Sequence, residues 1–165
     1  MPAPPYLHVL LNPVPVYGLA MGVIALLTAF VLRSSAARVV ALTLICLSSA
    51  AAWPVYHYGE KAYDDVMMIT DDEGTKWMDE HKRRAEKLIG CFYALAALAF
   101  AALVIPRKWP RFEAPLSTIT LVLAVAVLCI GGWIAFAGGH IRHEEFRSGK
   151  LPISEKQKSK SSGSE

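Results

Sequence analysis

The residues of this chain with the clearest potential for chemistry are its five histidines, because a neutral imidazole nitrogen is a common metal ligand. Two spacings support this interpretation: His57-x-x-Glu60 and His140-x-x-His143 are i, i+3 pairs, which share one face of a helix. Imidazole and carboxylate donors suit Zn²⁺, iron or Mn²⁺. We therefore predict a metal site whose candidate ligands are His57, Glu60, His81, His140 and His143.

A haem is the second form that such a site can take, because haem iron accepts axial imidazoles from different helices. His57 and His140 are the pair that we expect to bind it, since they follow the second and the fourth apolar run of the chain. No histidine lies inside an apolar run, so the haem would bind at an edge of the apolar region. The predicted cofactor is therefore haem b or a transition metal, in a redox or accessory component.

The same histidines have a simpler interpretation, in which they lie at the membrane surface and form hydrogen bonds to neighbouring carboxylates. The chain would then be a structural subunit or assembly factor of a membrane complex, with no cofactor. The sequence contains no H-E-x-x-H motif, no glycine-rich phosphate loop and no C-x-x-C pair. No catalytic residue is indicated, so an enzyme is not the expected class.

Four apolar runs must position these side chains, and their length identifies the class of protein. The chain has 165 residues, of which 54% are hydrophobic, and a mean hydropathy of +0.36. Each run lacks Asp, Glu, Lys, Arg and His and, at about 18 to 22 residues, can cross the hydrocarbon core of a bilayer. The runs are 13–32, 39–56, 88–105 and 116–137. Because they are apolar on every face, a soluble helical bundle is disfavoured.

The connections between the runs define the predicted architecture. Short basic segments separate the first run from the second and the third from the fourth, so each pair forms an antiparallel hairpin. We predict an all-α, integral membrane four-helix bundle within residues 1–147, with a polar cap at 57–87 that gathers the histidines on one side. The Lys- and Ser-rich tail, 148–165, is expected to be disordered. Gly18 and Gly22 have the spacing of a helix-packing face.

The distribution of charge bears on orientation and partners. The two short connections contain five basic residues and one acid, whereas the histidine side contains the other twelve of seventeen basic residues and thirteen of fourteen acids. The density of basic residues favours a cytoplasmic position for the short connections, whereas their raw count favours the opposite orientation. No Lys or Arg precedes the first apolar run, which favours short connections in the cytoplasm. The histidine cap and both termini are therefore expected outside it, on a bacterial inner membrane. The net charge of +3 does not indicate nucleic acid, so the expected partners are the lipid bilayer and a larger membrane complex or a second copy.

Four short motifs resemble a bacterial family of uncharacterised four-helix integral membrane proteins. They are Leu7-His8-x-Leu10-Leu11-x-x-x-Pro15, Gly59-Glu60, Glu80-His81 and Gly138-Gly139-His140-Ile141-Arg142-His143. The first helix of that family typically opens His-Pro-Leu-Leu-Val-His-Phe-Pro. Here Val9 stands in place of the first proline and Pro13 in place of the second histidine. The resemblance covers residues 7–146 and implies a small bacterial integral membrane protein, and the family brings no established activity.

Overall fold

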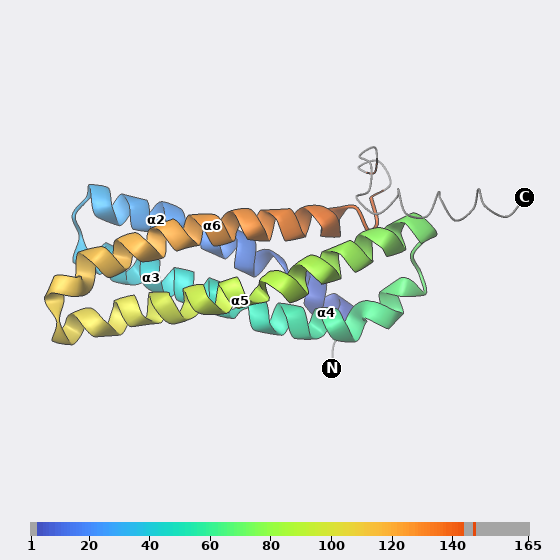
Figure 1. The fold of residues 1–165 in the computed structure, drawn as a ribbon, viewed down its shortest axis with the longest axis horizontal. Coiled ribbons are helices and arrows are strands. Elements are labelled where there is room, and N and C mark those ends of the chain that lie inside the picture. Colours follow the sequence, from blue (N-terminus) through green and yellow to red (C-terminus); the bar gives the residue numbers. More distant parts are fainter. Residues whose placement is uncertain (1–2, 144–146, 148–165) are drawn as a thin grey trace, which may run out of the picture.

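The computed structural model of the chain describes residues 3–143 and residue 147, and every regular element within them is a helix (Figure 1). Four helical spans are long and apolar enough to cross a membrane: Pro4–Val31, Ser35–Met67, Asp72–Lys108 and Pro110–Gly139. The predicted all-α, four-helix membrane bundle is thus confirmed. Each predicted apolar run overlaps one of these spans, and each span begins before its run. The predicted tail, 148–165, lies outside the described residues.

The first span is not one continuous α-helix, because prolines interrupt its opening turns. α1 (Pro4–Leu11) is followed by a π-helical turn, η1 (Val14–Gly18), and then by α2 (Leu19–Val31). Pro15 lies inside the π-helical turn, where its missing N–H removes one α-helical hydrogen bond. The helical chain therefore starts before the predicted boundary at residue 13, and the additional helix α1 includes His8.

The second span is divided into α3 (Ser35–Ala50) and α4 (Ala52–Met67). Pro54 accounts for the division, because proline cannot donate a hydrogen bond to the carbonyl of Ala50 and is tolerated in the first turn of a new helix. α4 continues past residue 56, where the apolar run ends. The first part of the predicted polar cap is therefore a helical extension.

The third and fourth spans are α5 (Asp72–Lys108) and α6 (Glu113–Gly139), joined by a 3₁₀ turn, η2 (Pro110–Phe112). Asp71 is the N-cap of α5, because its side chain accepts a hydrogen bond of 3.2 Å from the N–H of Gly74. The second part of the polar cap is thus the beginning of α5. The cap consists of two helices that continue out of the apolar bundle.

Helix packing joins the spans into one bundle, in which α2 packs against α3, α3 against α5, α5 against α6, and α1 against α4 (Figure 1). The largest fully buried apolar side chains are Leu19, Leu26, Ile45, Leu95 and Val127. Gly22 allows α2 and α3 to approach closely, since a Cβ there would lie 2.6 Å from Cγ1 of Ile45. Many large apolar side chains point outward, as expected for a surface that contacts lipid.

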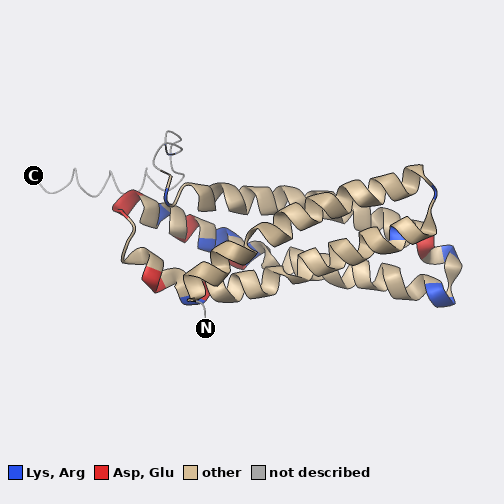
Figure 2. Cartoon of the chain, turned by 180° about the vertical axis from the view of Figure 1, so that it is seen from behind, with Lys and Arg blue, Asp and Glu red and all other residues tan. Residues whose placement is uncertain are grey.

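Charged residues lie only at the two ends of the described bundle, and the helices between these ends have none (Figure 2). One end contains the connections 32–34 and 109–112, and we call it the short-loop end. The other end, which we call the histidine end, contains α1, the second half of α4, the first half of α5 and the C-terminus of α6. The five histidines lie at the histidine end.

Candidate functional site

His8 lies on α1 and is fixed by the neighbouring helix α4. Its Nδ1 lies 2.8 Å from the carbonyl oxygen of Val55, and because a carbonyl can only accept, Nδ1 donates the proton. Gly59 faces the same ring, since a Cβ there would lie 2.9 Å from both Cε1 and Nδ1 of His8. Because Gly59 has no side chain, the imidazole can pack directly against α4. Nε2 is then the nitrogen that remains for a ligand.

His81 repeats this arrangement on the second hairpin, between α5 and α6. Its Nδ1 donates to the carbonyl oxygen of Ile134 at 2.9 Å. A Cβ at Gly138 would lie 3.1 Å from Cε1 and Nδ1 of this ring. In both hairpins, a histidine of the first span donates to a carbonyl of the second span and packs against the glycine four residues later. The two halves of the bundle therefore present equivalent imidazoles.

The two imidazoles lie at the wall of one cavity. Their ring centroids are 6.3 Å apart and their planes form an angle of 81°. The cavity has a volume of about 160 Å³ and lies between α1, η1, α4, α5 and α6. Most of its wall is apolar, with contributions from Val16, Val55, Ile89, Phe92 and Ile134. Two imidazoles thus line a largely apolar space at the histidine end.

Tyrosines and one lysine form the polar rim of this cavity. The Tyr56 hydroxyl donates to Oε1 of Glu60 at 3.1 Å. The Tyr63 hydroxyl donates to Asp79 and so joins α4 to α5. The Lys82 ammonium lies 4.4 Å from the centroid of the Tyr63 ring. The two contacts of Tyr63 hold the extended helices α4 and α5 together beside the cavity.

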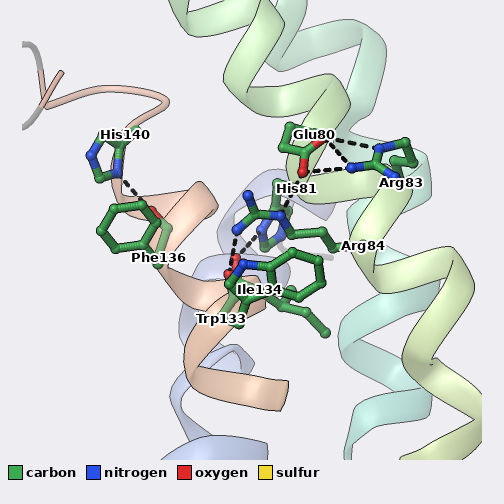
Figure 3. Close-up of polar contacts among 8 residues, drawn as sticks. All are labelled: Glu80, His81, Arg83, Arg84, Trp133, Ile134, Phe136 and His140. Carbon is green, nitrogen blue, oxygen red and sulfur yellow. Dashed lines mark hydrogen bonds and ion pairs between the residues drawn. The ribbon is translucent and has the colours of Figure 1, made fainter. Parts of the chain in front are cut away.

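A buried ionic cluster fixes α5 against α6 next to His81 (Figure 3). Glu80 is only 1% exposed and Arg84 only 4% exposed. The Glu80 carboxylate accepts hydrogen bonds of 2.7 Å from Nε of Arg84 and of 2.7 and 2.9 Å from Arg83. Arg84 also donates to the carbonyl oxygen of Trp133 at 2.7 Å, and its guanidinium lies 4.1 Å from the Trp133 ring centroid.

This cluster and His81 form hydrogen bonds to adjacent carbonyl groups of α6. Arg84 bonds to Trp133 and His81 bonds to Ile134, one residue further along α6. Both α5 side chains therefore set the same register between α5 and α6. A charge buried in this way must stay paired, since an isolated buried guanidinium is costly.

His140, predicted as a haem ligand, is buried in an aromatic cluster away from the cavity wall. It is 6% exposed, and its Nδ1 lies 2.7 Å from the carbonyl oxygen of Phe136, on its own helix. Its ring centroid lies 4.4 Å from those of Trp77 and Phe136. Figure 3 shows the His140 ring over Phe136, apart from the His81 ring. Its surroundings are those of a packing residue.

The other predicted ligands occupy separate positions. The His57 ring stacks on Trp53 at 5.5 Å with an angle of 4° between the planes. Glu60 lies at the cavity rim with Tyr56, and His143 is exposed beyond the end of α6. Within residues 3–143 and 147, no three His, Cys, Asp or Glu side chains gather closely enough to hold a metal. The structure thus does not assemble the predicted five ligands, and of these only His81 and Glu60 line the cavity.

Arg147 fastens the end of α6 to the start of α5. Its guanidinium donates to the carbonyl oxygens of His140 at 2.9 Å and Ile141 at 2.6 Å, and to Oδ2 of Asp71 at 2.5 Å. The hydrogen bond from Arg147 lowers the pKa of Asp71 below its ordinary value, an effect that desolvation opposes and the N–H of Gly74 reinforces. These contacts join α5 and α6 at the histidine end.

His8 is the residue of this site that was not among the predicted ligands. A signal was nevertheless present in the motifs of the family resemblance. His8, Gly59, His81 and Gly138 each belong to a different one of the four motifs, and they meet as two histidine–glycine contacts. No protein-family model, curated protein or solved structure matches the chain. The resemblance therefore stays a prediction.

Proposed function

We propose that this chain is a membrane component that binds one metal centre between His8 and His81, and that this centre is the iron of a haem. The observation that supports the proposal is the repeated arrangement of two histidines on one cavity. Each hairpin supplies an imidazole fixed through Nδ1, so Nε2 is the nitrogen available to a metal. A bound haem iron would supply one-electron transfer.

The spacing of the two rings suits one shared metal atom. Metal–nitrogen bonds are about 2.0–2.1 Å long, so two nitrogens that held one metal would lie within about 4 Å of each other. The half-width of each imidazole adds to this separation, which brings the ring centres close to the observed 6.3 Å. A larger bridging group between the two nitrogens would require the rings to lie further apart.

The donor set favours haem iron over a bare ion. Two imidazoles leave a Zn²⁺ ion short of the four ligands that it prefers, and the described residues provide no third His, Cys, Asp or Glu at metal-binding distance. Haem iron brings four nitrogens of its own and needs only axial ligands from the protein. Apolar walls such as Val55 and Phe92 also suit the faces of a porphyrin.

The volume of the cavity limits how much of a haem it can enclose. About 160 Å³ is close to the volume of about 150 Å³ that holds one aromatic ring in an engineered protein cavity. A porphyrin is several times larger than one aromatic ring, so its central part would lie between the two imidazoles and its outer part would extend beyond this cavity. The proposal is therefore a haem that the cavity encloses only in part at the histidine end, with His8 and His81 in place of the predicted His57 and His140.

The experiment is a visible spectrum with elemental analysis of the detergent-purified chain, expressed with iron and a haem precursor supplied. We expect a Soret band and iron close to one per chain, and loss of both in His8→Gln and in His81→Gln. A stoichiometric metal without a Soret band would replace haem by a bare ion. A colourless, metal-free protein that co-purifies with a larger complex would overturn the proposal in favour of a structural subunit or assembly factor.

The proposal places the site on the extracytoplasmic face of a bacterial inner membrane. Its support is the density of basic residues in the two short loops, since the positive-inside rule assigns basic short loops to the cytoplasm. A phosphatase that is active only outside the cytoplasm, fused after residue 165, should show activity. A fluorescent protein that matures only in the cytoplasm, fused at the same point, should stay dark, and the reverse pair of results would contradict this orientation.

A further inference from the structure

We propose that the short-loop end binds the headgroups of anionic phospholipids through Arg33, Arg107, Lys108 and Arg111. This surface is independent of the cavity and lies at the opposite end of the bundle (Figure 2). The partner is inferred from charge, from the aromatic side chains beside it and from its place at the ends of membrane spans.

The first observation is an excess of positive charge that the chain does not neutralise. Five basic residues and one carboxylate, Glu113, occupy this end, which leaves a net charge of about +4. Glu113 is already engaged, since its Oε1 lies 2.5 Å from Nη1 of Arg38 and accepts from the Ser35 hydroxyl at 3.2 Å. The other four basic side chains form no ion pair with a carboxylate among residues 3–143 and 147.

The second observation is that both loops contribute to one surface. Glu113 accepts hydrogen bonds from Ser35 and Arg38, and these bonds join the start of α6 to the start of α3. The two connections therefore lie side by side at the end of the bundle, as Figure 1 shows. Arg33 precedes α3 in one loop, and Arg111 lies in η2 of the other. A lipid layer around this end would meet their charges together.

The third observation is the pairing of cations with exposed aromatic rings. The Lys108 ammonium lies 4.9 Å from the Trp109 ring centroid, and the Arg111 guanidinium lies 4.9 Å from that of Phe112. Trp109 is 46% exposed and Phe112 is 39% exposed. Aromatic rings at the ends of membrane spans lie at the level of the headgroups. Cations beside them are therefore level with lipid phosphates, which favours a phospholipid over an acidic protein or a nucleic acid.

The expected strength follows from the number of charges. A basic residue near an anionic membrane surface strengthens binding by about fivefold. The contribution of exposed charges falls as salt rises, because the Debye length shortens from about 10 Å at 0.1 M to about 3 Å at 1 M. Preference for anionic over zwitterionic lipid should thus be both charge-dependent and salt-dependent.

The test titrates the full-length protein in detergent with phosphatidylglycerol or with phosphatidylcholine and counts bound lipids by native mass spectrometry. The variant is Arg107→Gln/Lys108→Gln/Arg111→Gln. The matched control is Lys61→Gln/Lys76→Gln/Lys87→Gln, three exposed lysines of the opposite end. Helix content and melting temperature verify that both fold, and Arg107→Gln alone replaces the triple variant if that variant does not.

We expect the unmodified protein to prefer phosphatidylglycerol, with about a fivefold loss for each charge removed from the short-loop end. The control should keep the preference of the unmodified protein. Equal binding of the two lipids by the unmodified protein would overturn the proposal. An equal loss in variant and control would also overturn it, because binding would then depend on net charge rather than on this surface.

Discussion

Two pairs of histidines at the same end of this bundle differ in what holds their rings. His8 and His81 each donate to a carbonyl of a neighbouring helix and contact a common cavity. His140 bonds to Phe136 of its own helix, and His57 stacks on Trp53, also of its own helix. Hydrogen bonds to a neighbouring helix thus place the first pair on the cavity, whereas the second pair has a bond to its own helix at His140 and packs against aromatic rings.

This difference shows which kind of spacing is informative for a site between helices. Residues three or four positions apart share a face of one helix, and that rule selected His57 and His140. A site between helices needs side chains from segments far apart in sequence. His8 and His81 are 73 positions apart, and each fits only because a glycine stands opposite its ring. The glycines therefore mark the positions of the cavity histidines.

The largest expected loss of stability comes from breaking the ionic cluster that aligns α5 with α6 beside His81. Glu80→Gln leaves the buried Arg84 without its carboxylate, which should lower the free energy of unfolding by about 3–5 kcal/mol. The shift in register should also weaken the bond from His81 to Ile134. Denaturant titration in detergent measures the loss of stability. Metal content measures the loss at the site.

Glu86→Gln is the matched control, because Glu86 is an exposed carboxylate of the same helix. It lies 3.9 Å from Lys82, a pair for which we expect a change of less than about 0.5 kcal/mol. Similar losses of stability in Glu80→Gln and Glu86→Gln would show that the Glu80 cluster does not fix this part of the bundle.

A smaller loss of stability should follow from adding one methyl group beside His81. Gly138→Ala would place a Cβ 3.1 Å from two atoms of the ring, and such overpacking typically costs about 1–3 kcal/mol. Gly139→Ala is the adjacent control, since nothing lies within 4 Å of a Cβ there. The control should be neutral or stabilising by up to about 1 kcal/mol, because alanine favours helix over glycine.

Melting temperatures of the two variants measure this difference, and Gly59→Ala repeats the experiment at His8. Equal melting temperatures for Gly138→Ala and Gly139→Ala would contradict the close contact of His81 with α6.

The smallest effect concerns the bond between Asp71 and Arg147, which joins α5 and α6 at the histidine end without contacting the cavity pair. Because this bond lowers the pKa of Asp71 from its ordinary value of 3.8, its stabilising contribution is complete above that value. The contribution is lost as pH falls through the lowered pKa of the folded state. Melting curves below pH 4 should therefore decline more steeply for the unmodified protein than for Asp71→Asn. Parallel declines would contradict this role for Asp71.

Most of the fold was predictable because apolar length alone identifies a membrane span. The four runs contain no charged residue, and each lies largely within one observed span. The additional helices were harder to predict. α1 precedes the first apolar run, which begins at residue 13, and the extension of α4 is polar. These segments are helical because they pack against neighbouring helices. The local composition of the sequence does not reveal such contacts.

The site was predictable only in part, for the same physical reason. His81 was among the predicted ligands, and it lines the cavity. His8 has no local partner, and its importance depends on Gly59, which is 51 positions away. The ligand roles predicted for His57, His140 and His143 stay predictions. Their positions, against aromatic rings or beyond the end of α6, do not bring them together.

The most direct test of the difference between the pairs is to measure the Soret absorbance and iron content of two double variants prepared side by side. His8→Gln/His81→Gln removes the cavity pair, and His57→Gln/His140→Gln removes the outer pair. Melting temperature verifies that each variant is folded. We expect absorbance and iron to disappear from the first variant and to persist in the second. Retention of both in the first variant, or their loss only from the second, would contradict a haem site between His8 and His81.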